Sequence, residues 1–89
     1  MDYQAIIHAL VDSIVEHPES VLIRELPNEN SEKDVTLLIV TEKEDTARLI
    51  GHKGIIANAL REVVGVAGKT ENKRVHLKFE SFDEEREGE

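Results

Sequence analysis

The sequence predicts one small domain of the α/β group, more narrowly α+β, in which a three-stranded sheet carries helices on one face. Three observations predict this fold. Apolar side chains recur at helical spacing over residues 2–17. Residues 35–41, VTLLIVT, form a nearly continuous apolar run, which is typical of a central strand. Residues 74–79, RVHLKF, alternate between charged and apolar side chains, as a strand with one buried face does.

The first half of the chain predicts a helix followed by two strands. The helix over residues 2–17 should end at Pro18, because proline cannot continue a helix. The short β-branched run at residues 21–26 predicts the first strand. The polar loop 27–34 then leads into the strand 35–41. We expect the two strands to pair antiparallel, which is the simplest connection.

A short helix should follow the second strand. Thr41 and Glu44 have the spacing of a capping box, which predicts a helix that starts near Glu42 and ends at Ile50. We expect Ala47 and Ile50 to face the core.

The last part of the domain predicts a longer helix and a final strand. The helix should run from Ile55 to about Ala67, with Gly68 as its left-handed cap. The strand 74–79 is reached through two helices, and a connection of that length permits parallel pairing with the strand 35–41 by a right-handed crossover. The complete order is α-β-β-α-α-β.

Length and composition limit the classes of protein to which the chain can belong. Its 89 residues suffice for one domain, which we place at residues 1–79, followed by an acidic tail at 80–89 that we expect to be disordered. There is no cysteine, so disulfides and thiolate metal ligands are excluded. No leader sequence or long apolar run is visible, which predicts a cytoplasmic protein without a membrane partner.

The formal net charge of −8 is unevenly distributed along the chain. Residues 48–78 contain seven bases and only two acids. Such a separation indicates an electropositive working region inside an acidic molecule. The plain alternative is an acidic surface that serves solubility.

The stretch 51–54, Gly-His-Lys-Gly, lies between the two later helices and is the best candidate for a binding site. Glycine at both ends permits positive φ and a close approach to a ligand. We expect the amides near Gly54 and Ile55 to meet a phosphate, with charge from Lys53 and a further donor on His52. The pattern favours a phosphodiester backbone over a base edge. The alternative is a helix corner that needs glycine only for its angle.

Two other binding functions remain open. A helix-turn-helix DNA reader also joins two helices through a short turn, but Ile55, Ile56 and Ala57 are poorly suited to reading base edges. A protein interaction or dimerisation module without nucleic-acid binding would account for the surplus of apolar residues, among them Ile55 and Val66.

Neither an enzyme nor a cofactor is predicted. The four histidines are isolated from one another, and no serine lies in a nucleophile elbow. The glycine stretch lacks the length and the Lys-Ser/Thr pair of a P-loop.

Residues 50–60, IGHKGIIANAL, resemble the I-G-x-x-G signature of KH domains, and the order of elements is similar to the type II arrangement. The length and the initial helix are similar to those of the small bacterial KhpA-type RNA-binding proteins. The resemblance implies that about four nucleotides of single-stranded RNA lie in a groove. Gly51, His52, Lys53 and Gly54 would then clamp the RNA backbone.

The resemblance also implies further contacts and partners. Ile50 and Ile56 would form or support the apolar floor of the groove, and Arg48 and Arg61 would flank it. The family implies a homodimer and pairing with a larger KH-containing protein of the KhpB type. It further implies a role in post-transcriptional control or in control of cell shape.

Overall fold

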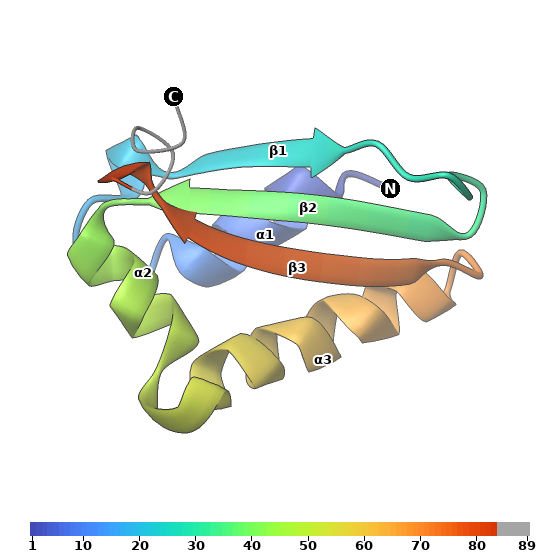
Figure 1. The fold of residues 1–89 in the computed structure, drawn as a ribbon. Coiled ribbons are helices and arrows are strands. Elements are labelled where there is room, and N and C mark those ends of the chain that lie inside the picture. Colours follow the sequence, from blue (N-terminus) through green and yellow to red (C-terminus); the bar gives the residue numbers. More distant parts are fainter. Residues whose placement is uncertain (84–89) are drawn as a thin grey trace.

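The computed structural model describes residues 1–83, and Figure 1 shows the fold. Within these residues the elements are α1 (Tyr3–Val11), β1 (Leu22–Leu26), β2 (Asp34–Thr41), α2 (Lys43–Ile50), α3 (Ile55–Lys69) and β3 (Arg74–Ser81), with short 3-10 turns η1 (Pro18–Ser20) and η2 (His52–Gly54). The predicted order α-β-β-α-α-β is confirmed.

The sheet has the strand order β1-β2-β3. The hairpin of β1 and β2 is antiparallel, with Leu22 opposite Val40. β3 runs parallel to β2, with Leu77 opposite Leu37, and is reached through α2 and α3. Both predicted pairings are therefore confirmed, and β3 is an edge strand of the described sheet.

The three helices pack against one face of the sheet, as predicted. The buried side chains of the core cluster come from all three helices and all three strands, and they include Ile7, Val11, Leu49, Leu60, Val64, Ile23, Leu37, Ile39 and Leu77. Figure 1 shows α1 behind the sheet, while α2 and α3 form a V whose point lies away from the strands. The stretch 51–54 occupies that point.

A buried carboxylate ties α2 to the segment between α1 and β1. Asp45 is fully buried, and its two oxygens accept the backbone N–H groups of Glu16 at 2.9 Å and His17 at 3.0 Å. Arg48 donates to the same carboxylate at 2.7 Å and pairs with the Glu16 carboxylate at 3.0 Å. Every buried polar atom in this network therefore has a partner, as a stable interior requires.

The predicted extent of the first helix was wrong. α1 ends at Val11 instead of residue 17. The same carboxylate keeps the helix from reaching residue 17, because the amides of Glu16 and His17 donate to Asp45 and not to the carbonyls of a continuing helix.

The predicted capping box at the start of α2 was also wrong. Glu42 is the N-cap, and it makes no side-chain capping hydrogen bond. The hydroxyl oxygen of Thr41 lies 2.6 Å from that of Thr46, in a buried pair that joins the end of β2 to the helix. The Thr41 hydroxyl is therefore used in this buried pair and does not cap α2.

The predicted inner face of α2 was wrong as well. Leu49 is buried, whereas Ala47 and Ile50 are exposed. Asp45 and Leu49 lie one helical turn apart, so burying Asp45 turns Leu49 to the core and Ala47 to solvent.

Gly68 is not the left-handed cap that was predicted. α3 continues through it to Lys69, and the positive φ of 58° belongs to Asn72. A Cβ at Gly68 would lie 2.7 Å from the Lys73 carbonyl oxygen and 2.8 Å from Val75, so this position needs glycine because the chain passes close to it.

The boundary between domain and tail also differs from the expectation. β3 extends to Ser81, which is buried, so the domain continues past residue 79. Most of the predicted disordered tail, residues 84–89, lies outside the described residues.

The carboxylate network makes stability depend on pH. Burial alone would raise the pKa of Asp45, but the hydrogen bonds from Glu16, His17 and Arg48 outweigh burial and lower it. A lowered pKa contributes stability that is present above the ordinary value of about 3.9 and is lost as the pH falls through the folded value.

We expect Asp45→Asn to lower the free energy of unfolding at pH 7 by about 2 kcal/mol, because an amide replaces an oxygen that accepts a buried N–H. The difference from wild type should be smaller at pH 3, which lies below the ordinary carboxyl pKa of about 3.9, because protonation of Asp45 in the unfolded wild type then offsets part of the stability that the folded carboxylate contributes. Urea unfolding at both pH values measures this. Asp2→Asn is the control, since Asn caps α1 as Asp does. An Asp45→Asn deficit that is equal at both pH values would contradict the role of the charge.

Candidate nucleic-acid interface

The loop between α2 and α3 is built from unusual backbone conformations. Gly51 ends α2 with φ 74° and ψ 175°, and Gly54 is the N-cap of α3 with φ 78° and ψ 15°. Lys53 also has a positive φ of 55°, which is uncommon for a residue with a side chain. Three of the four residues in the stretch therefore have a positive φ, and only two of them are glycine.

The two glycines serve different purposes. A Cβ on Gly51 would collide with the side chain of Ile56, which packs from the first turn of α3 against the bare backbone. Nothing lies within 4 Å of the position that a Cβ on Gly54 would take. Gly51 is therefore needed for a close contact inside the corner as well as for its φ, whereas Gly54 is needed for its φ and faces open space.

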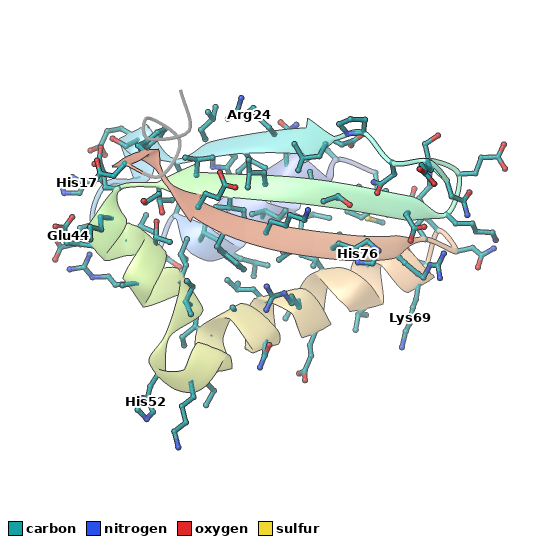
Figure 2. The ribbon with its side chains drawn as sticks, in the orientation of Figure 1. His17, Arg24, Glu44, His52, Lys69 and His76 are labelled. Carbon is teal, nitrogen blue, oxygen red and sulfur yellow. The ribbon has the colours of Figure 1, made fainter. Side chains whose placement is uncertain are left out.

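The predicted backbone contacts to phosphate stay a prediction, and the amides of Gly54 and Ile55 already have partners within the turn. The N–H of Gly54 donates to the Gly51 carbonyl at 3.1 Å, and the N–H of Ile55 donates to the His52 carbonyl. Both amides close the turn itself. The loop instead presents the side chains of His52 and Lys53, which are exposed. Figure 2 shows His52 at the outer tip, pointing away from the sheet.

The three predicted isoleucines have different surroundings. Ile56 is half-buried and packs against the core cluster, so it supports the loop from inside. Ile50 and Ile55, on either side of the loop, are exposed. The predicted contribution of Ile50 and Ile56 to the floor of a groove stays a prediction.

Arg48 and the bases of β3 are largely paired with acids. Arg48 is held by Asp45 and Glu16, so it belongs to the scaffold next to the loop, and its predicted contact with RNA stays a prediction. Arg74 and His76 both pair with Asp34 at the start of β2. Within residues 1–83, Lys53 is in no ion pair.

This pairing changes the charge of the basic region. The charges of residues 48–78 alone do not include the acids that the fold brings next to these bases from earlier in the chain. These acids are Glu16 and Asp45, which pair with Arg48, and Asp34, which pairs with Arg74. The positive charge that remains near the loop is smaller than the sequence indicated and is centred on Lys53.

Arg61 reaches from α3 to the edge strand β3. Its Nη2 donates to the Leu77 carbonyl at 3.2 Å, and its Nη1 donates to the Asn58 side chain at 3.3 Å. Its Cζ lies over the ring of Phe79, 5.4 Å from the ring centre. The sequence placed Arg61 near the loop but gave no signal for Phe79, because the two residues meet only through the tertiary packing of α3 on β3.

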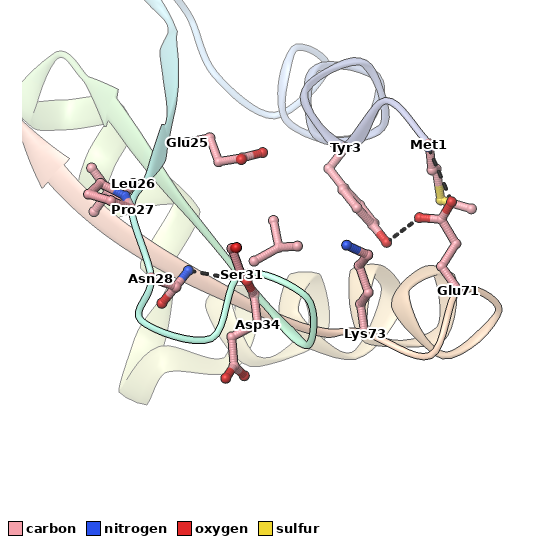
Figure 3. A pocket seen from close by; sticks show the side chains of 11 residues that line it. Met1, Tyr3, Glu25, Leu26, Pro27, Asn28, Ser31, Asp34, Glu71 and Lys73 are labelled. Atoms are coloured by element: carbon pink, nitrogen blue, oxygen red, sulfur yellow. Dashed lines mark hydrogen bonds and ion pairs between the residues drawn. The ribbon is translucent and has the colours of Figure 1, made fainter.

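A polar cavity of about 370 Å³ lies at the other end of α3, near the loop between β1 and β2 (Figure 3). Inside it, the Tyr3 hydroxyl donates to Glu71 at 2.7 Å, and burial together with this bond raises the pKa of Tyr3 to about 12. Carboxylates of Glu25, Asp34 and Glu71 line the cavity, so it is unsuited to a phosphate.

Neither a metal cluster nor a membrane-spanning helix is present in residues 1–83, the part of the chain that the structure describes. No group of three or more histidine or acidic side chains in it is arranged to hold a metal ion. None of its helices has the length and apolar character needed to cross a bilayer.

Comparison with known proteins identifies the family. The sequence model of the KhpA/KhpB KH domain matches residues 4–79. The RNA-binding protein KhpA of Listeria monocytogenes strain EGD-e is 33% identical over 76 residues, which cover 85% of this chain and 96% of the relative. That of Bacillus subtilis strain 168 is 33% identical over 78 residues, covering 88% and 89%. That of Clostridium perfringens strain 13 is 36% identical over 70 residues, covering 79% and 89%.

No solved structure matches the chain. The names of these bacterial relatives describe RNA binding and no reaction. The resemblance drawn from residues 50–60 is thus confirmed over most of the sequence. The chain belongs to the KhpA/KhpB KH-domain family.

Proposed function

We propose that this chain binds single-stranded RNA in the cytoplasm and that the loop Gly51–Gly54 clamps the phosphate backbone. The observation that carries the proposal is the form of the loop. Its corner is fixed from inside by Ile56, while Lys53 and His52 project into solvent next to the open space at Gly54. A fixed loop with a projecting cation suits a phosphate, which is recognised by charge and position.

The acidic character of the chain limits how RNA can bind. A net charge of −8 repels RNA at a distance, so binding must depend on local contacts. Each phosphate that is neutralised on a single strand adds about 0.7 to the slope of log affinity against log salt. With charge centred on Lys53, we expect a shallow slope and modest affinity.

We expect the double substitution His52→Asp/Lys53→Asp to weaken binding of short single-stranded RNA at least tenfold, because it places two carboxylates where phosphate would lie. Fluorescence anisotropy at two salt concentrations measures the loss. Circular dichroism checks that the variant is folded.

The double substitution His17→Asp/Lys33→Asp is the matched control, since it changes the net charge equally with exposed side chains outside the loop. It should retain most of the affinity. Equal losses of RNA affinity in both variants would mean that the loop contributes only to the overall charge of the protein and does not contact phosphate specifically. Unchanged binding by the loop variant would make it a plain helix corner, and the interaction-module alternative would then lead.

We also propose that the chain forms a homodimer through the outer face of α3. Ile55, Val63 and Val66 on this helix are 65%, 49% and 64% exposed, and Ala59 is exposed between them. Their spacing places all four on one face of the helix, where they form an apolar stripe. A stripe of this kind suits a two-fold contact with the same stripe on a second copy.

The same stripe suits a larger KH-containing protein of the KhpB type, which is the alternative partner. A binder of this design carries no chemistry of its own. Its proposed role is post-transcriptional control, and a role in cell shape is inferred from the family resemblance alone.

We expect the wild type to have a solution mass of two 10.0 kDa chains and Val66→Glu to have the mass of one, because a carboxylate would be desolvated in the centre of the contact. Light scattering after gel filtration measures both. Ile14→Glu, at an exposed apolar residue outside α3, should remain dimeric. A wild type that is monomeric at about 100 μM would contradict this contact, since stable dimers have much lower dissociation constants.

A further inference from the structure

We propose that the guanidinium of Arg61, held over the ring of Phe79, is a stacking surface for one base of the bound RNA. The inference rests on the proposed RNA binding and adds a base contact to the backbone contact at the loop. It assigns a positioning role to Phe79, which lies beneath the guanidinium.

The guanidinium is fixed from three directions. It donates to the Leu77 carbonyl on β3 at 3.2 Å and to the Asn58 side chain on α3 at 3.3 Å, and Phe79 lies below it. Phe79 is in turn half-buried and packs against the core cluster. The planar group is thus held in place before any ligand arrives, which lowers the entropy lost on binding.

Phenylalanine, tyrosine and tryptophan offer few other surfaces on which a base could stack within residues 1–83. The sequence contains only three aromatic residues. Tyr3 is buried and bonded to Glu71, while Phe79 and Phe82 are half-buried. Proteins that bind single-stranded RNA stack bases on aromatic rings or on arginine guanidinium planes. Arg61 is exposed, so it is accessible to a base from solvent.

The position of Arg61 relative to the loop fits one continuous strand of RNA. Arg61 comes seven residues after Gly54, which places it about 10 Å further along the axis of α3. KH domains hold about four nucleotides. An RNA backbone held at the loop can therefore bring a neighbouring base over Arg61, where the cation and the base face attract each other.

A charge contact and a stacking contact can be separated by Arg61→Lys. Lysine keeps the positive charge but has no planar group to stack. We expect this variant to bind single-stranded RNA about five- to thirty-fold more weakly, within the range for loss of one stacked base. Its salt slope should equal that of the wild type, since no phosphate contact is lost.

The direct probe is a short single-stranded RNA with the fluorescent base 2-aminopurine placed at each position in turn. We expect quenching by the wild type at one position and loss of that quenching with Arg61→Lys. Phe79→Leu, which keeps an apolar side chain but removes the ring, should reduce the quenching as well. Arg74→Lys makes the same chemical change about 16 Å along β3 from Phe79 and should leave the quenching intact.

The outcomes are distinct. If Arg61→Lys binds as the wild type does with equal quenching, or loses affinity only through a shallower salt slope, the stacking role is overturned while RNA binding stands. If the wild type binds no RNA at low salt, the proposed function fails and the stacking surface fails with it.

Discussion

The contact of Ile56 with the bare backbone of Gly51 is the constraint on which the candidate site depends. A side chain at residue 51 would push the first turn of α3 away from the end of α2. Without that contact the two helices would meet at a different angle, and the tip of the loop would point elsewhere. The positive φ angles of Gly51, Lys53 and Gly54 are the local conformations through which the chain makes this corner.

Both arms of the corner are anchored far from its tip. The buried carboxylate of Asp45 holds α2 to the segment that precedes β1. Leu60 and Val64 hold α3 to the sheet, and the close passage of Lys73 over Gly68 fixes its far end. The exposed side chains at the tip are therefore presented by a rigid frame. A loop in such a frame binds with little loss of conformational freedom.

Elements with a strong periodic pattern were predicted well from the sequence. The strand 35–41, the alternating strand at 74–79 and the helix from Ile55 all lie where their apolar spacing placed them. Predictions failed where a distant residue decides a local structure. The amides of Glu16 and His17 donate to Asp45, which keeps the first helix from continuing to residue 17. No local pattern in the sequence reveals a partner about 28 residues away.

Only part of the candidate site was predicted from the sequence, because some of its features also depend on residues that are distant in the sequence. The loop and its glycines follow from local sequence, because the required backbone conformations have a local signature. The pairing of Arg48 with Glu16 and the position of Arg61 over Phe79 depend on how separate elements pack. Counts of charge along the chain share this weakness, since acids from other segments neutralise part of the basic region.

The central claim is that RNA meets the tip of the α2–α3 corner. The most direct measurement is an NMR titration of the ¹⁵N-labelled chain with a short single-stranded RNA, following every backbone amide. The account predicts that the largest changes in amide chemical shift occur at His52, Lys53 and Gly54 and that smaller changes extend along α3 toward Arg61. Changes confined to the face of the sheet opposite the helices, or to the cavity around Tyr3 and Glu71, would contradict it.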